Sequence, residues 1–321
     1  MEYKKDLAIE NMRLNDFVEG FYLLQSAQVK TASNGKAFLS ATLSDASGTV
    51  EAKAWDYVGT VGTKDEGDVV KIRGNITEYK GTLQLNIEKI RKACDNDVYD
   101  ISKLVPTSPL DTEKAYAELL QIVNGLSDND YKAVCLEMLK RHGDEFKKIP
   151  AAKSVHHGFL HGLLMHTLYM VKTADYLAKL YCEITDRNLL IAGTLLHDFA
   201  KIEEFTVSKL GLVSEYSEKG QLLGHLTMGA FEVSKISESL GIPEKKSILL
   251  QHMILSHHGT PEFGAAVVPM CPESELLSLI DLIDSRMEIY RESFKELPVG
   301  QFSQRIFALD KRIYHHSETE N

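Results

Sequence analysis

Residues 189–201 read LLIAGTLLHDFAK, and this stretch does most to decide the fold of the second part of the chain. Most of its length is apolar, which is typical of a helix that is buried on every side. The run ends near His197 and Asp198, an ionisable pair that is costly to bury unless it is matched. A divalent cation is the most economical match, because it stabilises a neutral imidazole and a deprotonated carboxylate together. The stretch therefore predicts a buried helix ending at a metal site, in which Asp198 can direct one oxygen at each of two ions.

Further histidines and acids follow the same pattern of ionisable residues within apolar surroundings. The chain has 12 histidines, and none lies before His142. The motifs are GLLMHTLYMV with His166, GQLLGHLTMG with His225, ILSHHGTPEFG with His257 and His258, and IDLIDSRM with Asp281 and Asp284. Nitrogen and oxygen ligands without sulfur favour Mn, Fe, Mg, Co or Zn over thiophilic ions. The four cysteines show no CxxC spacing, which argues against a structural zinc site and a disulfide framework.

The segments around these motifs predict helices. From about residue 116 onward, apolar residues recur at i, i+3 and i+4 spacing. We therefore expect an all-α domain over residues 116–321. The stretch before it, residues 94–115, contains Asp97, Pro106 and Pro109 and is predicted to be a linker.

The first part of the chain predicts strands instead. Turn signals such as Asn34-Gly35, Ser47-Gly48 and Lys80-Gly81 separate runs rich in β-forming residues, and alternation is clear at 83–88. The expected strands are 17–30, 36–44, 48–55, 69–77 and 82–91. Five short strands in under 100 residues suggest a small closed barrel, of which the OB-fold is the commonest. We therefore expect an OB-fold domain over residues 1–93.

Charge and hydropathy limit the partners that the chain can have. The net charge is −10, yet acids and bases balance within residues 1–93, so the acidic excess lies in the later part. This balance permits nucleic acid at the first domain without predicting it. No apolar run reaches membrane-spanning length, and the N-terminus lacks the apolar core of a signal peptide. We expect a cytoplasmic protein without a membrane partner.

The succession H…HD…H…H…D on predicted helices is the signature of the HD superfamily of metal-dependent phosphohydrolases. More closely, VHHGFLHGLLMHT, LLHDFAKIEE, LLGHLTMG, LSHHGTPEFG and IDLIDSRM resemble the motifs of YhaM-type 3′→5′ exoribonucleases, which join an N-terminal OB domain to an HD domain. The resemblance implies hydrolysis of phosphodiester bonds in single-stranded RNA, with single-stranded DNA as a further candidate substrate. The nucleophile would be a water activated by the metal.

The resemblance also assigns roles to individual residues. It implies that His166, His197, Asp198 and Asp281 hold one ion, and that a second is held by His225 with one or both of His257 and His258. Asp284 remains the alternative to Asp281, because it lies nearer the apolar stripe of Leu277, Ile280 and Met287 on a helical wheel. Manganese is the ion we expect first, with Mg, Fe, Co or Zn as alternatives.

Substrate contacts are expected on both domains. Lys201 lies one helical turn after Asp198, and the resemblance implies that it contacts the phosphate and acts with Asp198 in catalysis. A solvated surface lysine is the alternative for this position. His156 and His157 are further candidates for phosphate binding, with structural roles equally open, and His161 receives no role. On the OB domain, stacking aromatics and basic residues would hold single-stranded nucleic acid. The candidates there are Phe38, Trp55, Tyr79, Lys36, Lys53, Arg73 and Lys80.

Two other functions remain open on the sequence. The chain could be an HD-type nucleotide phosphohydrolase, although such an enzyme has little need of an OB module. It could also be a nucleic-acid-binding factor with a vestigial HD site, although no position of the motif has been lost. Exposed apolar helix faces leave assembly into a homo-oligomer open.

Overall fold

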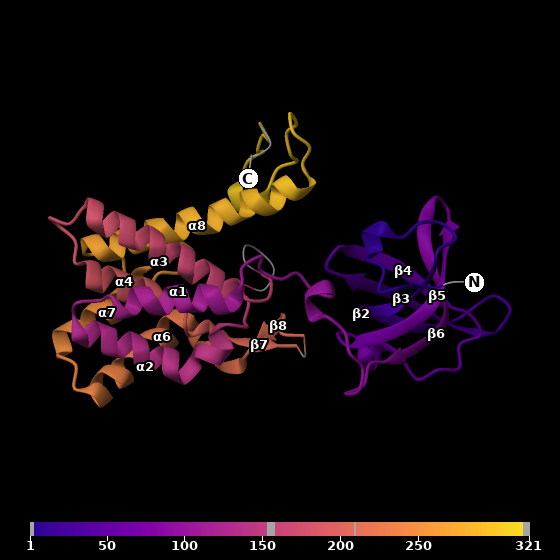
Figure 1. Cartoon of the computed structure of the whole chain (residues 1–321), viewed down its shortest axis with the longest axis horizontal. Coiled ribbons are helices and arrows are strands. Elements are labelled where there is room, and N and C mark those ends of the chain that lie inside the picture. The colour runs from indigo at the N-terminus through magenta and orange to yellow at the C-terminus, as the bar shows by residue number, and fades with distance from the viewer. Residues whose placement is uncertain (1–2, 153–157, 209, 317–321) are drawn as a thin grey trace. The chain divides into compact units, whose positions relative to one another are not determined.

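The structure is a computed structural model, and it describes residues 3–152, 158–208 and 210–316. It divides into two compact units, residues 1–107 with 208–210 and residues 108–207 with 211–321 (Figure 1). The division at Thr107 falls within the predicted linker. The predicted fold class, a small β-barrel followed by a helical domain, is confirmed.

The first unit is a closed five-stranded barrel with one short additional strand. Its strands are β1 (Lys4–Lys5), β2 (Phe17–Thr31), β3 (Ala37–Asp45), β4 (Gly48–Ala54), β5 (Val69–Tyr79) and β6 (Thr82–Lys92), with the 3₁₀ turns η1 (Ile9–Asn11), η2 (Thr63–Asp65) and η3 (Ile101–Lys103). The strand order is β1-β2-β3-β4-β6-β5, and β2 also pairs with β5, which closes the barrel. β4 and β6 pair in parallel, and β5 and β6 form an antiparallel hairpin.

Alternating side chains fill the interior of the barrel. Along β3, Leu39, Ala41 and Leu43 are buried and Ser40 and Thr42 are not. This period of two is the expected pattern for a strand with one face on a core. The part of the predicted linker nearest the barrel is folded onto it, since the Lys103 carbonyl accepts a hydrogen bond from the Ala46 amide.

The second unit is helical, as predicted, with one short two-stranded ribbon in addition. Its elements are α1 (Thr112–Asn124), α2 (Asn129–Phe146), α3 (Gly162–Leu180), α4 (Arg187–Leu196), α5 (Lys201–Glu204), β7 (Phe205–Val207), β8 (Val213–Tyr216), α6 (Glu218–Leu240), α7 (Glu244–Ser256), η4 (Pro261–Phe263), α8 (Pro272–Glu296) and η5 (Phe307–Leu309). Side chains at the N-caps of four helices accept backbone hydrogen bonds and fix where those helices begin. The capping residues are Asp111, Asp128, Asp186 and Ser217.

Helix α4 lies within this unit and is packed against α2, α3, α7 and α8 (Figure 1). Every residue from Leu189 to Leu196 is buried, which explains the almost unbroken apolar sequence there. Because other helices surround α4, the residues that follow its C-terminal end, His197 and Asp198, also lie in the interior of the domain. Within the described ranges, no helix combines the length and the apolar character that a bilayer crossing requires.

Candidate metal centre and barrel surface

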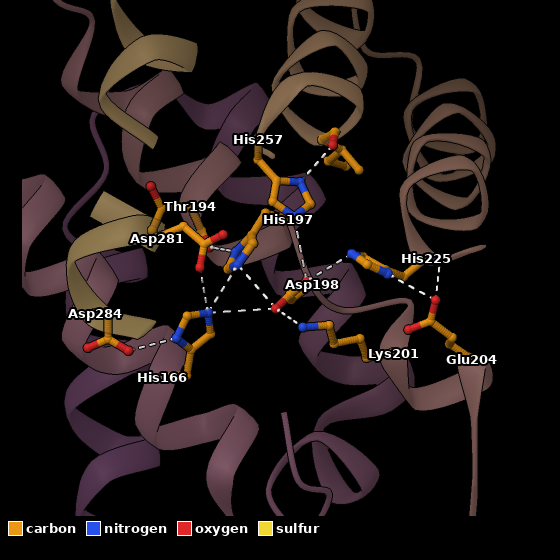
Figure 2. A network of polar contacts seen from close by, with 11 residues as sticks. His166, Thr194, His197, Asp198, Lys201, Glu204, His225, His257, Asp281 and Asp284 are labelled. Atoms are coloured by element: carbon orange, nitrogen blue, oxygen red, sulfur yellow. Dashed lines mark hydrogen bonds and ion pairs between the residues drawn. The ribbon is translucent and has the colours of Figure 1, made fainter. Parts of the chain in front are cut away.

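Most of the histidines and acids that the sequence assigns to a metal site converge within the helical unit, and Figure 2 shows His166, His197, Asp198, His225, His257 and Asp281 there. His166 comes from α3, His197 is the residue after α4, and Asp198 follows it directly. His225 comes from the middle of α6, and His257 is the residue after α7. These five side chains are almost completely buried, so five ionisable groups share an interior from which water is largely excluded.

The first cluster comprises His166, His197 and Asp198. Their ligand atoms lie within 4.8 Å of one another, a spread that one cation can span. The Nε2 atoms of the two histidines are 3.3 Å apart, and Asp198 Oδ2 lies 3.3 Å from His197 Nε2. Asp281 Oδ1 approaches the same place, 3.4 Å from His166 Nε2. The cluster therefore offers two imidazole nitrogens and two carboxylate oxygens.

The second cluster comprises His225, His257 and His258, whose ligand atoms also lie within 4.8 Å of one another. The other oxygen of Asp198 faces this cluster, with Oδ1 3.4 Å from His225 Nε2 and 3.7 Å from His257 Nε2. Asp198 thus points one carboxylate oxygen at each cluster. This is the geometry of a carboxylate that bridges two ions.

Backbone carbonyls set the orientation of two of the imidazoles. The Nδ1 atom of His197 lies 2.8 Å from the Thr194 carbonyl oxygen, and Nδ1 of His257 lies 2.7 Å from the Ile254 carbonyl oxygen. A carbonyl can only accept, so each Nδ1 carries the proton and donates. In the neutral rings Nε2 is then unprotonated and faces the cluster, as a metal ligand must.

The ring of His166 distinguishes the two candidate aspartates. Its Nδ1 donates to Asp284 Oδ2 at 2.7 Å, while its Nε2 faces Asp281 (Figure 2). Asp284 therefore contacts the side of the ring turned away from the cluster, and Asp281 contacts the side turned toward it. On this geometry we infer that Asp281 is the ligand and that Asp284 orients His166.

The polar atoms left without partners test whether a cation fits. Asp198 Oδ1, His225 Nε2, His257 Nε2 and His258 Nδ1 are buried atoms that accept no hydrogen bond in the described part of the chain. Buried polar atoms are normally satisfied, because leaving one unpaired costs about 1–3 kcal/mol. All four atoms lie at or beside the second cluster, and all are nitrogen or oxygen atoms that can bind a metal ion. A divalent cation would satisfy them together, so the residues fit the group that the sequence predicts.

Burial and neighbouring charges shift the pKa values of these groups in different directions. Burial, followed by the proximity of His197, holds the pKa of His257 well below its usual value, and burial also lowers that of His258. Both rings are therefore neutral and ready to bind a cation. Burial opposes protonation of His197 too, but Asp198 outweighs it and raises the pKa of that ring. A proton on His197 thus competes with a cation at the first cluster.

Lys201 forms an ion pair with Asp198, whose carboxylate faces both clusters. Its Nζ lies 2.7 Å from Asp198 Oδ2, and its side chain is nearly buried. Burial works against both charges, but the Lys201 ammonium leads the neighbouring charges that hold the pKa of Asp198 well below its usual value, and Asp198 raises the pKa of Lys201. The predicted phosphate-binding lysine is therefore charged and lies at the edge of the first cluster.

A buried acid, Glu204, lies beside the second cluster. His156 and His157 lie outside the described residues. Glu204, which the motif reasoning did not select, is buried and accepts a hydrogen bond from the backbone N–H of His225, with its Oε1 3.0 Å from His225 Nδ1. His161 is held apart from the clusters, since its Nδ1 contacts the Lys147 carbonyl.

On the barrel, five of the seven residues predicted to contact nucleic acid lie against one another. Phe38 and Trp55 stack with centroids 5.0 Å apart, and Lys53 lies over the rings of both Trp55 and Tyr79. Lys80 lies over Tyr79 as well. These five residues are called the aromatic patch below.

The other two predicted barrel contacts are engaged elsewhere. Lys36 pairs with Asp56 at 2.7 Å. The Arg73 guanidinium stacks 3.8 Å from the Tyr3 ring centroid and lies beside Glu88. Each of these two cations lies against a carboxylate, so neither contributes an unpaired positive charge to the patch.

Two family models each match one part of the chain. Residues 26–93 match the family model described as an OB-fold nucleic acid binding domain, and residues 163–286 match the HD domain model. Solved structures similar to the chain include the second OB-fold domain of replication protein A from Methanococcus maripaludis, at 14% identity over 30% of this chain and 100% of that one, with a TM-score of 0.22. Another is an OB domain from Thermoplasma acidophilum, at 14% identity over 30% of this chain and 92% of that one, with a TM-score of 0.25.

Proposed function

Because the chain carries an OB-fold domain followed by an HD domain, which indicates metal-dependent phosphohydrolase activity, we propose that it is a 3′→5′ exoribonuclease acting on single-stranded RNA. Single-stranded DNA is a further candidate substrate. The observation that carries the proposal is the position of Asp198, whose two oxygens face two separate clusters of ligand atoms. Support for a polymeric substrate comes from the barrel and its aromatic patch. The direction of digestion rests on the family resemblance.

Each part of the metal centre has a defined task in this proposal. Divalent cations held by the two clusters, manganese first among the candidates, would polarise the phosphoryl oxygens and activate a water for attack. His166, His197, Asp198 and Asp281 would hold one, and His225, His257, His258 and Asp198 the other. The Lys201 ammonium lies where it can contact a phosphate oxygen and stabilise developing negative charge.

The aromatic patch would hold the strand by stacking. Trp55 is 54% exposed and Tyr79 is 56% exposed, so both side chains are accessible to a nucleobase from solvent. Stacking tolerates any base, and the ammonium groups of Lys53 and Lys80 add attraction to the phosphate backbone.

Digestion of labelled oligonucleotides tests the proposal. The full chain is incubated with 5′-labelled RNA or DNA of identical sequence and Mn²⁺, with free mononucleotides assayed in parallel. We expect RNA to give a ladder that shortens from the 3′ end and to lose all cleavage in EDTA. An intact oligonucleotide beside hydrolysed mononucleotide would instead identify a nucleotide phosphohydrolase. Binding without any cleavage would identify a nucleic-acid-binding factor with an inactive HD site.

Trp55→Ala should weaken the binding of single-stranded RNA by roughly 5- to 150-fold, because one stacked base is worth about 1–3 kcal/mol. The measurement is fluorescence anisotropy with a labelled oligonucleotide in EDTA, which prevents cleavage. The matched control is Phe307→Ala, which removes a 97% exposed aromatic ring from the helical unit. Equal affinity of Trp55→Ala and the wild type would exclude the aromatic patch as the binding surface.

A further inference from the structure

Glu204 is a buried acid that the ligand set of the two clusters does not use. It is the last residue of α5 and is only 5% exposed, whereas the neighbouring Glu203 is exposed and pairs with Lys219. An ionised carboxylate is costly to bury without specific partners. Its position at this depth therefore requires partners that compensate the charge.

The partner of Glu204 is His225, contacted at two atoms. Glu204 Oε1 accepts a hydrogen bond from the backbone N–H of His225 at 2.9 Å and lies 3.0 Å from its Nδ1 (Figure 2). An ionised carboxylate can only accept, so Nδ1 carries the proton in the neutral ring. The unprotonated Nε2 then points toward Asp198 Oδ1 at 3.4 Å and has no hydrogen-bond partner within the described ranges.

The backbone at Gly224 makes the first of these contacts available. Gly224 has φ 69° and ψ 158°, which interrupts helix α6 immediately before His225. His225 therefore begins a second helical segment, whose first amide donors have no intrahelical acceptor. The Glu204 carboxylate supplies that acceptor, and a negative charge at a helix N-terminus is electrostatically favourable.

The main chain of Glu204 is anchored to the first turn of α6 as well. Its carbonyl oxygen accepts a hydrogen bond from the Ser217 amide at 2.8 Å. A Cβ at Gly220 would come within 2.3 Å of the same oxygen, so only glycine permits this close approach. The backbone and the side chain of Glu204 thus contact α6 on both sides of the interruption at Gly224.

We propose that Glu204 is a positioning residue that holds His225 in the orientation and tautomer required to bind a cation at the second cluster. This inference rests on the proposed function only in requiring that the second cluster holds a cation. Carboxylates that accept from the outer nitrogen of a metal-binding histidine commonly change metal affinity by about 10- to 100-fold when removed. Replacement of Glu204 should weaken cation binding at the second cluster and leave the affinity of the first cluster unchanged.

The test counts Mn²⁺ ions by isothermal titration calorimetry on the full chain, in Glu204→Ala, Glu204→Gln and Glu203→Ala. The alanine variant removes the acceptor, and one of two ions should bind about 10- to 100-fold more weakly. The glutamine variant keeps a carbonyl oxygen that can accept from both N–H groups, so it should recover most of that affinity. Glu203→Ala removes the adjacent exposed carboxylate and should bind both ions as the wild type does.

A second readout is independent of metal. Nitrogen NMR of histidine-labelled, metal-free chain should show the Nδ1–H tautomer for His225 in the wild type and in Glu204→Gln, and a mixture of tautomers in Glu204→Ala. Wild-type affinity for both ions in folded Glu204→Ala would overturn the proposal. If Glu204→Ala does not fold, the glutamine variant decides: loss of the Nδ1–H tautomer despite its retained carbonyl would overturn it.

The outcome for Glu204 is separable from the outcome for RNA hydrolysis. A wild-type chain that binds two ions but leaves RNA intact would refute the proposed exoribonuclease activity. The loss of one ion in Glu204→Ala would still establish the positioning role in that case.

Discussion

Asp198→Asn should reduce RNA hydrolysis by about 10³-fold or more while the helical domain stays folded. Asp198 directs one carboxylate oxygen at each cluster, so its replacement would affect an ion at either cluster rather than at one of them. An amide is a poor ligand for a divalent cation compared with a carboxylate, and it cannot offer an anionic oxygen to both sides. Loss of the ions removes the activated nucleophile and the charge stabilisation together.

The asparagine variant is preferred to alanine for a structural reason. Lys201 is nearly buried and its Nζ donates to Asp198 Oδ2, so alanine would leave that ammonium without its acceptor. The amide oxygen of asparagine can still accept from Lys201. The measurement is the single-turnover rate on 5′-labelled RNA, with circular dichroism as the check on folding.

Asp144→Asn is the matched control for this experiment, because that carboxylate lies in α2 with 81% of its side chain exposed. Its activity should equal that of the wild type. If Asp198→Asn is folded and degrades RNA within tenfold of the wild-type rate, the bridging role of Asp198 is wrong.

The barrel could be predicted from the sequence because its signals are local. Alternation of apolar residues follows from the two-residue period of a strand, and turn residues mark the strand ends. Lys80 and Gly81 both have positive φ, at 54° and 82°, which is the backbone of a tight hairpin between β5 and β6. Glycine adopts positive φ without strain, so the Lys80-Gly81 pair is a sequence signal that predicts this turn.

The two strands of the short ribbon, β7 and β8, could not be predicted in the same way. They contain only FTV and VSEY, which is too short for a period of two to be recognised. Their pairing depends on the chain reversal between α5 and α6, a tertiary feature. The helical prediction for this domain is correct, and the ribbon is an addition to it.

The sequence alone does not determine whether Asp281 or Asp284 faces the first cluster. A helical wheel places Asp284 nearer the apolar stripe, and the structure explains this, since Asp284 faces inward onto His166 Nδ1. Which acid meets a metal depends on how the His166 ring is turned. That rotation is a property of packing between α3 and α8, and no residue spacing encodes it.

Glu204 was missed for a related reason. It stands beside Glu203 in the motif KIEE, and the two residues look alike in the sequence. Only the break at Gly224, 20 positions later, creates the unpaired amide that gives Glu204 its partner. Lys36 and Arg73 were chosen by charge alone, and the acids that pair with them became visible only in three dimensions.

Removal of divalent metal should lower the melting temperature of the helical unit by about 10 °C and leave the barrel unchanged. Binding at about 1,000 times the dissociation constant stabilises a folded protein by about 4 kcal/mol, and each kcal/mol shifts the midpoint of a domain of this size by about 2–4 °C. The physical basis is the group of four buried nitrogen and oxygen atoms that have no hydrogen-bond partner in the described part of the chain. A cation can bind these atoms together in the folded state, whereas the unfolded chain does not hold them close to one another.

Differential scanning calorimetry of the full chain measures this effect with an internal reference. Each unit has its own hydrophobic core, so we expect two transitions, of which only one should move when EDTA is replaced by Mn²⁺. The Asp198→Asn chain should show a much smaller metal-dependent shift, because its bridging ligand is lost. Identical transitions of the wild type in EDTA and in saturating Mn²⁺ would mean that the convergent imidazoles and carboxylates do not bind the ion, and the proposed hydrolytic chemistry would then have no basis.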